Sequence, residues 1–277
     1  MYTFRVDPNV TLVSAYFQMK SKFPVNRYEM WIRNFMKIKS NKLIFTDKES
    51  IGSIVKFDTG NTIYVVMKKE EFLVTKYDQE WKYNKTIDHE KYHTEDLYKV
   101  WAEKTNFLSR AIEMNPYNTE YFVWCDIGCF RKPKRMREFL YWPNTKNMDK
   151  KVTFLQLRDF LPKELENLDV IDDRFRYNIR NGGGIIAGHR DYLRRWHDIY
   201  YGTLEEFFAK KKFAGKDQCV FAYCILRNPD VCQFVRVPGN YVHDEWFYLE
   251  DHFNMTAKMA IADMIEGIIK NAIANVK

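Results

Sequence analysis

The sequence has no run of roughly 18 apolar residues, the length that a membrane-spanning helix needs. Residues 1–10 carry charges and a proline where a secretory signal peptide needs an apolar stretch. The five cysteines include no Cys-x-x-Cys pair, and an odd number of scattered thiols is typical of a reducing compartment. We therefore expect a cytoplasmic protein with free thiols and no stable membrane insertion.

Several nucleotide and hydrolase motifs are absent as well. No glycine loop is followed by Lys and Ser/Thr, which excludes a typical P-loop enzyme. No Gly-x-Ser-x-Gly elbow is present, which argues against a serine hydrolase of the α/β type. The glycines at 182–184 lack the Gly-x-Gly-x-x-Gly spacing and stand late in the chain, so a dehydrogenase-type dinucleotide loop is disfavoured.

Apolar and aromatic side chains, by contrast, are abundant. The chain is 46% apolar and 17% aromatic, enough for one large α/β domain with rings left to line a cleft. Sugar faces and nucleobases both stack on such rings. The net charge of +7 is spread along the chain without a basic tail. This distribution suits a small anionic ligand better than nucleic acid, so a basic nucleic-acid-binding module is the less favoured alternative.

An alternation of strand and helix patterns predicts a doubly wound sheet. Runs typical of buried strands lie at residues 10–17, 42–47, 61–67, 121–125, 152–157 and 232–237. Helical spacing of apolar residues predicts helices at 28–38, 97–114, from about 189 onward, and at 217–226. Residues 70–93 are expected to form a long, partly helical connection. The predicted fold is α/β, with a mostly parallel central sheet flanked by helices.

Residues 1–254 are expected to form one domain, because no repeat, linker or shift of composition divides them. Residues 255–277 carry an amphipathic helix, with Met259, Ile265 and Ile268 near one face. This face needs cover, either from the parent domain or from a second copy. A monomer or a homodimer is therefore expected.

The segment at residues 121–131 carries the strongest chemical signal. Asp126 follows a short apolar strand, and α/β sheets bind ligands outside the carboxyl ends of their strands. A carboxylate there can hold a hard divalent cation that bridges two phosphates. Gly128 leaves room for a diphosphate, and Arg131 can contact phosphate. The alternative is that Asp126 only caps the following turn.

This pattern resembles the Trp-x-Asp-x-Gly signature of the HtrL/YibB-like proteins, which are associated with surface-glycan synthesis. More distantly, the chain resembles GT-A glycosyltransferases. The likeness extends to residues 11–17, to the helix that contains Trp101 and Lys104, and to residues 181–184. It implies a Rossmann-like GT-A fold and transfer of a sugar from a nucleotide-diphosphate donor.

The resemblance also implies a metal site. GT-A enzymes usually hold the metal with Asp-x-Asp, and in this sequence the second acidic position is Gly128. A His near the C-terminus often closes such a site, and His243 is the match, although a structural role for this His is an equal alternative. Mn²⁺ accepts imidazole more readily than Mg²⁺ does, so Asp126 and His243 favour Mn²⁺, with Mg²⁺ as the second choice.

Further candidates follow from the same resemblance. Asp217 opens a predicted helix and could be a general base in an inverting reaction, could orient the acceptor in a retaining one, or could simply cap the helix. The remaining predicted donor-binding residues lie at strand ends or in the glycine segment, where the missing Cβ permits close approach; they are Ser14, Ala15, Tyr16, Asp47, Asn181, Gly182 and Gly183. Tyr16 could stack on uracil or could pack in the core.

We therefore expect a metal-dependent glycosyltransferase, with a UDP-sugar as the favoured donor and a glycan hydroxyl as acceptor. The product would belong to surface-glycan or glycoprotein synthesis. A catalytically degenerate GT-A-like binding protein is the alternative, because Gly128 replaces the second Asp of the metal motif.

Overall fold

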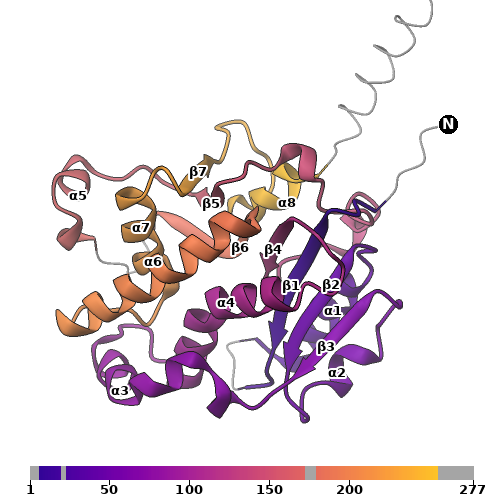
Figure 1. The fold of residues 1–277 in the computed structure, drawn as a ribbon, viewed down its shortest axis with the longest axis horizontal. Coiled ribbons are helices and arrows are strands. Elements are labelled where there is room, and N and C mark those ends of the chain that lie inside the picture. The colour runs from indigo at the N-terminus through magenta and orange to yellow at the C-terminus, as the bar shows by residue number, and fades with distance from the viewer. Residues whose placement is uncertain (1–5, 20–22, 172–178, 255–277) are drawn as a thin grey trace, which may run out of the picture.

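The computed structural model describes residues 6–19, 23–171 and 179–254. Its centre is a seven-stranded sheet of order β3-β2-β1-β4-β6-β5-β7 (Figure 1). The strands are β1 (Val10–Tyr16), β2 (Asn41–Thr46), β3 (Thr62–Val66), β4 (Tyr121–Cys125), β5 (Val152–Gln156), β6 (Asn181–His189) and β7 (Cys232–Arg236). The helices are α1 (Val25–Met36), α2 (Gly52–Val55), α3 (Asp78–Ile87), α4 (Glu95–Met114), α5 (Pro162–Glu166), α6 (Arg190–Ala209), α7 (Asp217–Arg227) and α8 (Tyr248–His252).

The sheet is mostly parallel, which confirms the predicted α/β class. β3, β2, β1 and β4 pair in parallel, as do β5 and β7. β6 runs antiparallel to both of its neighbours, β4 and β5. Because of this reversal, the first residues of β6 lie beside the carboxyl ends of β4 and β5.

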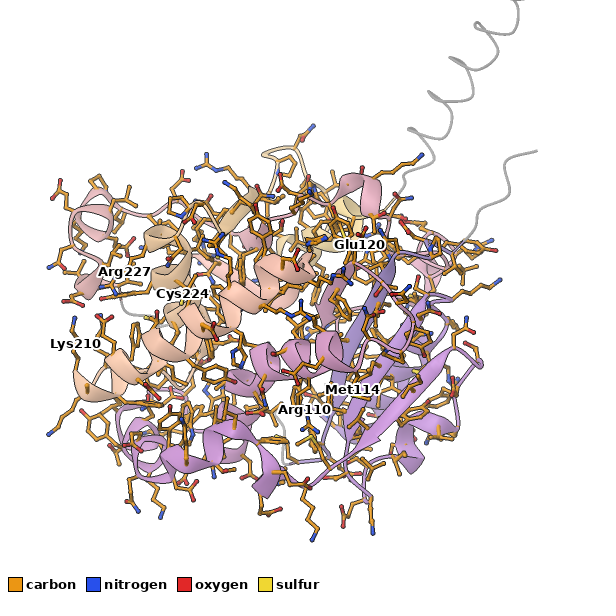
Figure 2. All side chains as sticks on the ribbon, in the orientation of Figure 1. Arg110, Met114, Glu120, Lys210, Cys224 and Arg227 are labelled. Carbon is orange, nitrogen blue, oxygen red and sulfur yellow. The ribbon has the colours of Figure 1, made fainter. Side chains whose placement is uncertain are left out.

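Helices cover both faces of the sheet, so its strands are apolar on both sides. On one face, Val13 and Trp124 pack with side chains of α4, α6 and α7. On the other face, Leu12 and Val123 pack with α1, with the segment that follows β4, and with α8. Figure 1 shows α4 and α6 crossing in front of the sheet, and Figure 2 shows the side chains that fill the space between them.

Helix α4 is well defined at both ends. The Thr94 side chain accepts a hydrogen bond from the backbone N–H of Leu97, and acidic residues occupy the first turn, where they suit the helix dipole. The helix ends at Asn115, whose φ of 30° lies in the left-handed region. Arg110 and Met114 mark its C-terminal end in Figure 2.

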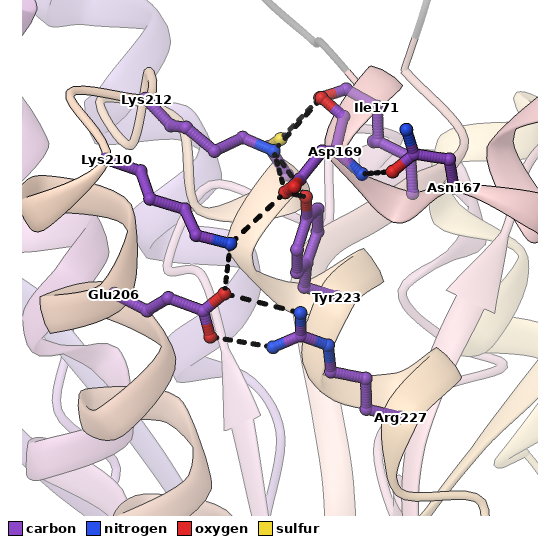
Figure 3. Close-up of polar contacts among 9 residues, drawn as sticks. Asn167, Asp169, Ile171, Glu206, Lys210, Lys212, Tyr223 and Arg227 are labelled. Carbon is purple, nitrogen blue, oxygen red and sulfur yellow. Dashed lines mark hydrogen bonds and ion pairs between the residues drawn. The ribbon is translucent and has the colours of Figure 1, made fainter.

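A surface network ties α7 to α6 at their C-terminal ends (Figure 3). Arg227 Nη1 lies 2.7 Å from a carboxylate oxygen of Glu206, and Lys210 Nζ lies 2.8 Å from the other. Hydrogen bonds from Arg227 and Lys210 lower the pKa of Glu206 to about 2. Asp169, in the segment that follows α5, accepts hydrogen bonds from Lys212 and Tyr223, which attaches this segment to the ends of α6 and α7. The network fixes the orientation of α7, whose first residue is Asp217.

Two observations refine the sequence-based expectations. The segment 181–189 is a strand, whereas the sequence suggested only a glycine-rich stretch before a helix. Helix α1 begins at Val25, after Pro24, three residues earlier than predicted. The predicted helix at residues 255–276 lies outside the described residues. Within residues 6–19, 23–171 and 179–254, no helix has the length and apolar composition needed to cross a bilayer.

Candidate active site

The sheet topology brings Asp126 and the glycine segment together. Strand order reverses between β1 and β4, and ligands of α/β sheets bind at such a switch point. Asp126 follows β4 directly, and its backbone N–H donates to the carbonyl of Gly184, 2.8 Å away. This contact extends the antiparallel pairing in which Cys125 faces Ile185. Asp126 therefore stands at the carboxyl end of a strand, as predicted, and the structure adds that it lies beside the glycine segment.

Lys104, from the buried face of α4, is the centre of the site. Its Nζ lies 3.1 Å from Asp126 Oδ1 and 2.9 Å from Asp217 Oδ2. The same ammonium donates to the carbonyl of Gly183 at 2.9 Å. Trp124 Nε1 donates to the same oxygen, Asp126 Oδ1, at 2.7 Å, which further restrains the carboxylate. Two predicted catalytic residues, Asp126 and Asp217, therefore meet on one cation.

The three charged groups differ in their access to solvent. The side chains of Lys104 and Asp217 are each 3% exposed, whereas that of Asp126 is 39% exposed. Burial alone would lower the pKa of Lys104, but Asp126 and Asp217 outweigh it, so that this pKa lies above its ordinary value. Two carboxylates around one ammonium leave one negative charge, which Asp126 presents at the surface.

The glycines of β6 are required by this packing. A Cβ on Gly183 would lie 2.9 Å from Asp217 Oδ2 and 3.0 Å from Phe221 Cε2. A Cβ on Gly182 would lie 3.1 Å from Leu155 Cδ2. The buried Asp217 thus occupies the space that a side chain at 183 would need. Asn181 is buried, and its Nδ2 has no hydrogen-bond partner among the described residues.

The burial of Asp217 bears on its predicted role. Its carboxylate is held against Lys104, and burial raises its pKa. In this arrangement Asp217 positions the Lys104 ammonium beside Asp126. Its action as a general base on an acceptor hydroxyl stays a prediction.

The predicted donor-binding residues of β1 and β2 lie at the carboxyl ends of neighbouring strands. Ser14 is fully buried, and its hydroxyl donates to the carbonyl of Cys125 at 2.7 Å, so that it braces β4. Asp47 Oδ1 accepts from the backbone N–H of Ser50 at 2.8 Å and thereby stabilises a turn. Ala15 and Tyr16 are half-buried, and the Tyr16 ring lies 6.4 Å from that of Tyr28.

Arg131 and His243 line one pocket. It lies between the segment after β4 and the segment before α8, and Lys132 and Glu250 also line it. Cys129 lines the same pocket, and its backbone N–H donates to the Asp126 carbonyl at 2.9 Å. The pocket is therefore next to Asp126 along the chain.

One group of three metal-type ligands lies close together among the described residues. Asp88, Glu90 and His93 each offer a ligand atom, all within 4.8 Å of one another, so this group could hold a metal ion. Each residue also has a protein partner. Tyr98 donates to Asp88 at 2.6 Å, and Lys216 Nζ lies 2.6 Å from Glu90. Burial would raise the pKa of Asp88, yet its hydrogen bonds, with that to His93 the largest, lower it to about 2.

Fold and site define an α/β protein with a charged centre at the carboxyl ends of a mostly parallel sheet. A profile of the family HtrL_YibB, described as a bacterial protein of unknown function, matches residues 8–255. The chain belongs to this family, as residues 121–131 suggested.

Solved structures similar to the chain include two enzymes. The apo form of mouse xyloside xylosyltransferase 1 is 11% identical, with a TM-score of 0.44 over 81% of this chain and 84% of that one. CMP:2-keto-3-deoxy-manno-octonic acid synthetase complexed with CTP is 10% identical, with a TM-score of 0.38 over 92% of this chain and 99% of that one. A search of curated proteins finds no match.

Sequence reasoning from the residues alone missed Lys104 and Trp124 as site residues. A signal for Lys104 is present in the sequence. Lys104 lies on the same face of α4 as Phe107, Leu108 and Ala111, at helical spacing, and all three of these apolar residues are buried. A lysine on such a face must bury its ammonium, and it needs a buried anion to do so.

Proposed function

We propose that the protein is a glycosyltransferase that moves a sugar from a nucleotide-diphosphate donor to a hydroxyl of a glycan acceptor, with a UDP-sugar as the favoured donor. The observation that carries the proposal is the Asp126–Lys104–Asp217 cluster at the topological switch point. The exposed Asp126 and the glycine backbone of β6 are suited to a polar ligand that must approach the main chain closely.

In the proposed reaction, this chain's residues position and neutralise charge. The Lys104 ammonium and the Trp124 indole N–H both contact Asp126 Oδ1 and restrain its carboxylate. Pre-organised groups of this kind cost no rearrangement when charge develops on the departing diphosphate. Asp217 keeps Lys104 protonated and in place, which is a positioning role.

Asp126 and His243 are the residues that we propose for Mn²⁺, or for Mg²⁺. The single negative charge that Asp126 presents to solvent fits a divalent cation, and His243 is exposed. When bound, the metal would neutralise the diphosphate of the donor. Because Gly128 supplies no second carboxylate, phosphate and water oxygens would have to complete the ligand set.

A binding screen tests the proposal. Nucleoside diphosphates and nucleotide sugars are added with and without Mn²⁺, and thermal unfolding is recorded. A ligand at about one hundred times its Kd is expected to stabilise the fold by about 2.7 kcal/mol. Asp126→Asn should abolish that shift, while Asp198→Asn, which changes an exposed carboxylate on α6, should preserve it. If no nucleotide shifts the transition of the wild-type protein, the proposal is wrong.

A further inference from the structure

The pocket beside Arg131 has features of a built site. Its volume is about 50 Å³. A single water needs roughly 10–15 Å³, so the pocket has room for a group the size of a phosphate.

Arg131 is fixed in the pocket wall before any ligand arrives. Its Cζ lies 4.5 Å from the ring centroid of Trp31 and 4.7 Å from that of Phe247. Its Nε donates to the Gly128 carbonyl at 3.1 Å. The two terminal guanidinium nitrogens have no hydrogen-bond partner among the described residues. They form the planar fork that binds phosphate or carboxylate with two parallel hydrogen bonds.

Besides the buried Glu250, one carboxylate, Asp244, lines the pocket, against two cations that have no acidic partner among the described residues, Arg131 and Lys132. Lys132 is exposed and makes no ion pair among residues 6–19, 23–171 and 179–254. Arg135, in contrast, is paired with Asp251 and with Glu138. Arg131 and Lys132 therefore contribute positive charge that a ligand can neutralise.

Glu250 completes the site from within the protein. The residue is 6% exposed, and its Oε1 has no hydrogen-bond partner among the described residues. Burial raises its pKa well above the ordinary value, although Arg135 opposes this effect. A neutral carboxyl can donate its O–H, and an unpaired buried polar atom is costly unless a ligand satisfies it.

We propose that this pocket binds a phosphate-type anion, with Arg131 and Lys132 supplying positive charge and Glu250 supplying a hydrogen-bond donor. The anion could be the diphosphate of the donor or an acidic group on the acceptor, and this assignment of its source rests on the proposed function. The position of Cys129 between the pocket and Asp126 places the anion next to the proposed reaction centre.

The experiment is calorimetric titration of the intact protein with pyrophosphate alone. Arg131→Met should weaken binding at least about tenfold, because it removes the guanidinium fork. Lys134→Met is the matched control, since Lys134 is an exposed cation of the same basic segment that does not line the pocket. It should change the affinity by less than about twofold. Circular dichroism establishes that each variant is folded.

Glu250→Gln tests the donor, because the amide keeps the shape and donates an N–H. Binding within about threefold of wild type is expected. A tenfold loss in this variant would mean that the ligand needs an ionised carboxylate, as a cation does, and would overturn the proposal. Equal losses in Arg131→Met and Lys134→Met, or no saturable binding by the wild-type protein, would overturn it too.

Competition then identifies the source of the anion. If UDP displaces pyrophosphate and uridine does not, the pocket takes the donor's diphosphate. If pyrophosphate binds alongside UDP, it takes an anionic group of the acceptor. Pyrophosphate binding requires no turnover. Pyrophosphate binding without sugar transfer would therefore contradict the proposed function and leave the anion site intact. Normal sugar transfer without pyrophosphate binding would contradict the proposed anion site and leave the proposed function intact.

Discussion

Replacement of Lys104 by Met tests the buried charge cluster. Met keeps most of the side-chain volume but removes the ammonium, which is 2.9 Å from Asp217 and 2.9 Å from the Gly183 carbonyl. Asp126 is 39% exposed and can be rehydrated, whereas Asp217 is 3% exposed and cannot. The loss therefore comes mainly from Asp217 and should be about 3–5 kcal/mol in the free energy of unfolding near pH 7.

Urea unfolding at equilibrium measures this loss, and Lys99→Met is the control. Lys99 lies on the same helix and pairs with Asp78 at 2.6 Å, but Asp78 is 56% exposed, so this change should cost about 1 kcal/mol or less. Adding Asp217→Asn to Lys104→Met removes the orphaned charge and should recover at least about 1 kcal/mol. A Lys104→Met loss no larger than that of Lys99→Met, or a double variant less stable than the single one, would refute the reasoning.

The pH dependence of Lys104→Met has a defined sign. Without the ammonium, Asp217 has a folded-state pKa raised by burial, so the folded state retains a proton that the unfolded state has lost. Stability of the variant should therefore fall as pH rises above about 4. In the wild-type protein, Lys104 has a raised pKa, so its contribution is complete below about pH 10 and is lost only at higher pH.

Three further outcomes are expected. Gly183→Ala should destabilise the protein by about 1–3 kcal/mol in urea unfolding, because the new Cβ would contact Asp217. The control, Gly202→Ala, lies in an open position on α6 and should be neutral or stabilising. Equal effects of the two changes would contradict this packing. Calorimetry should show weak Mn²⁺ binding to the free protein and strong Mn²⁺ binding when UDP is present. The reason is that Arg131 and other cations near His243 repel a metal ion until phosphate neutralises them. Tight Mn²⁺ binding without nucleotide would contradict this. Burial raises the pKa of Glu103 to about 7, so the stability of wild type relative to Glu103→Gln should decline between about pH 4 and 7. A constant difference would show that Glu103 does not titrate there.

The sequence was sufficient to predict strands whose side chains are apolar on both faces. β4 agrees residue for residue with the prediction, because five apolar residues precede a charged one. β6 was missed as a strand because glycine has a low strand propensity. Its glycines are needed for a tertiary reason: Asp217 and Leu155 occupy the space around them.

The site was predictable only where it depends on a local pattern in the sequence. Asp126 stands at a strand end, a local feature of the sequence, and could be found. Its pairing with Lys104 and Asp217 depends on the order of strands and on the packing of α4 against α7, which no local pattern specifies. The same limit applies to the Arg131 pocket, which joins segments more than one hundred residues apart.

The most direct test of the central claim is release of nucleoside diphosphate from a panel of nucleotide sugars, followed by mass spectrometry with and without glycan acceptors. The wild-type protein and Asp198→Asn should release the diphosphate from at least one donor at equal rates. Asp126→Asn, checked for folding by circular dichroism, should lower the rate by at least about a hundredfold. Equal rates in Asp126→Asn and wild type, or no release from any donor by the wild-type protein, would contradict a transferase centred on Asp126.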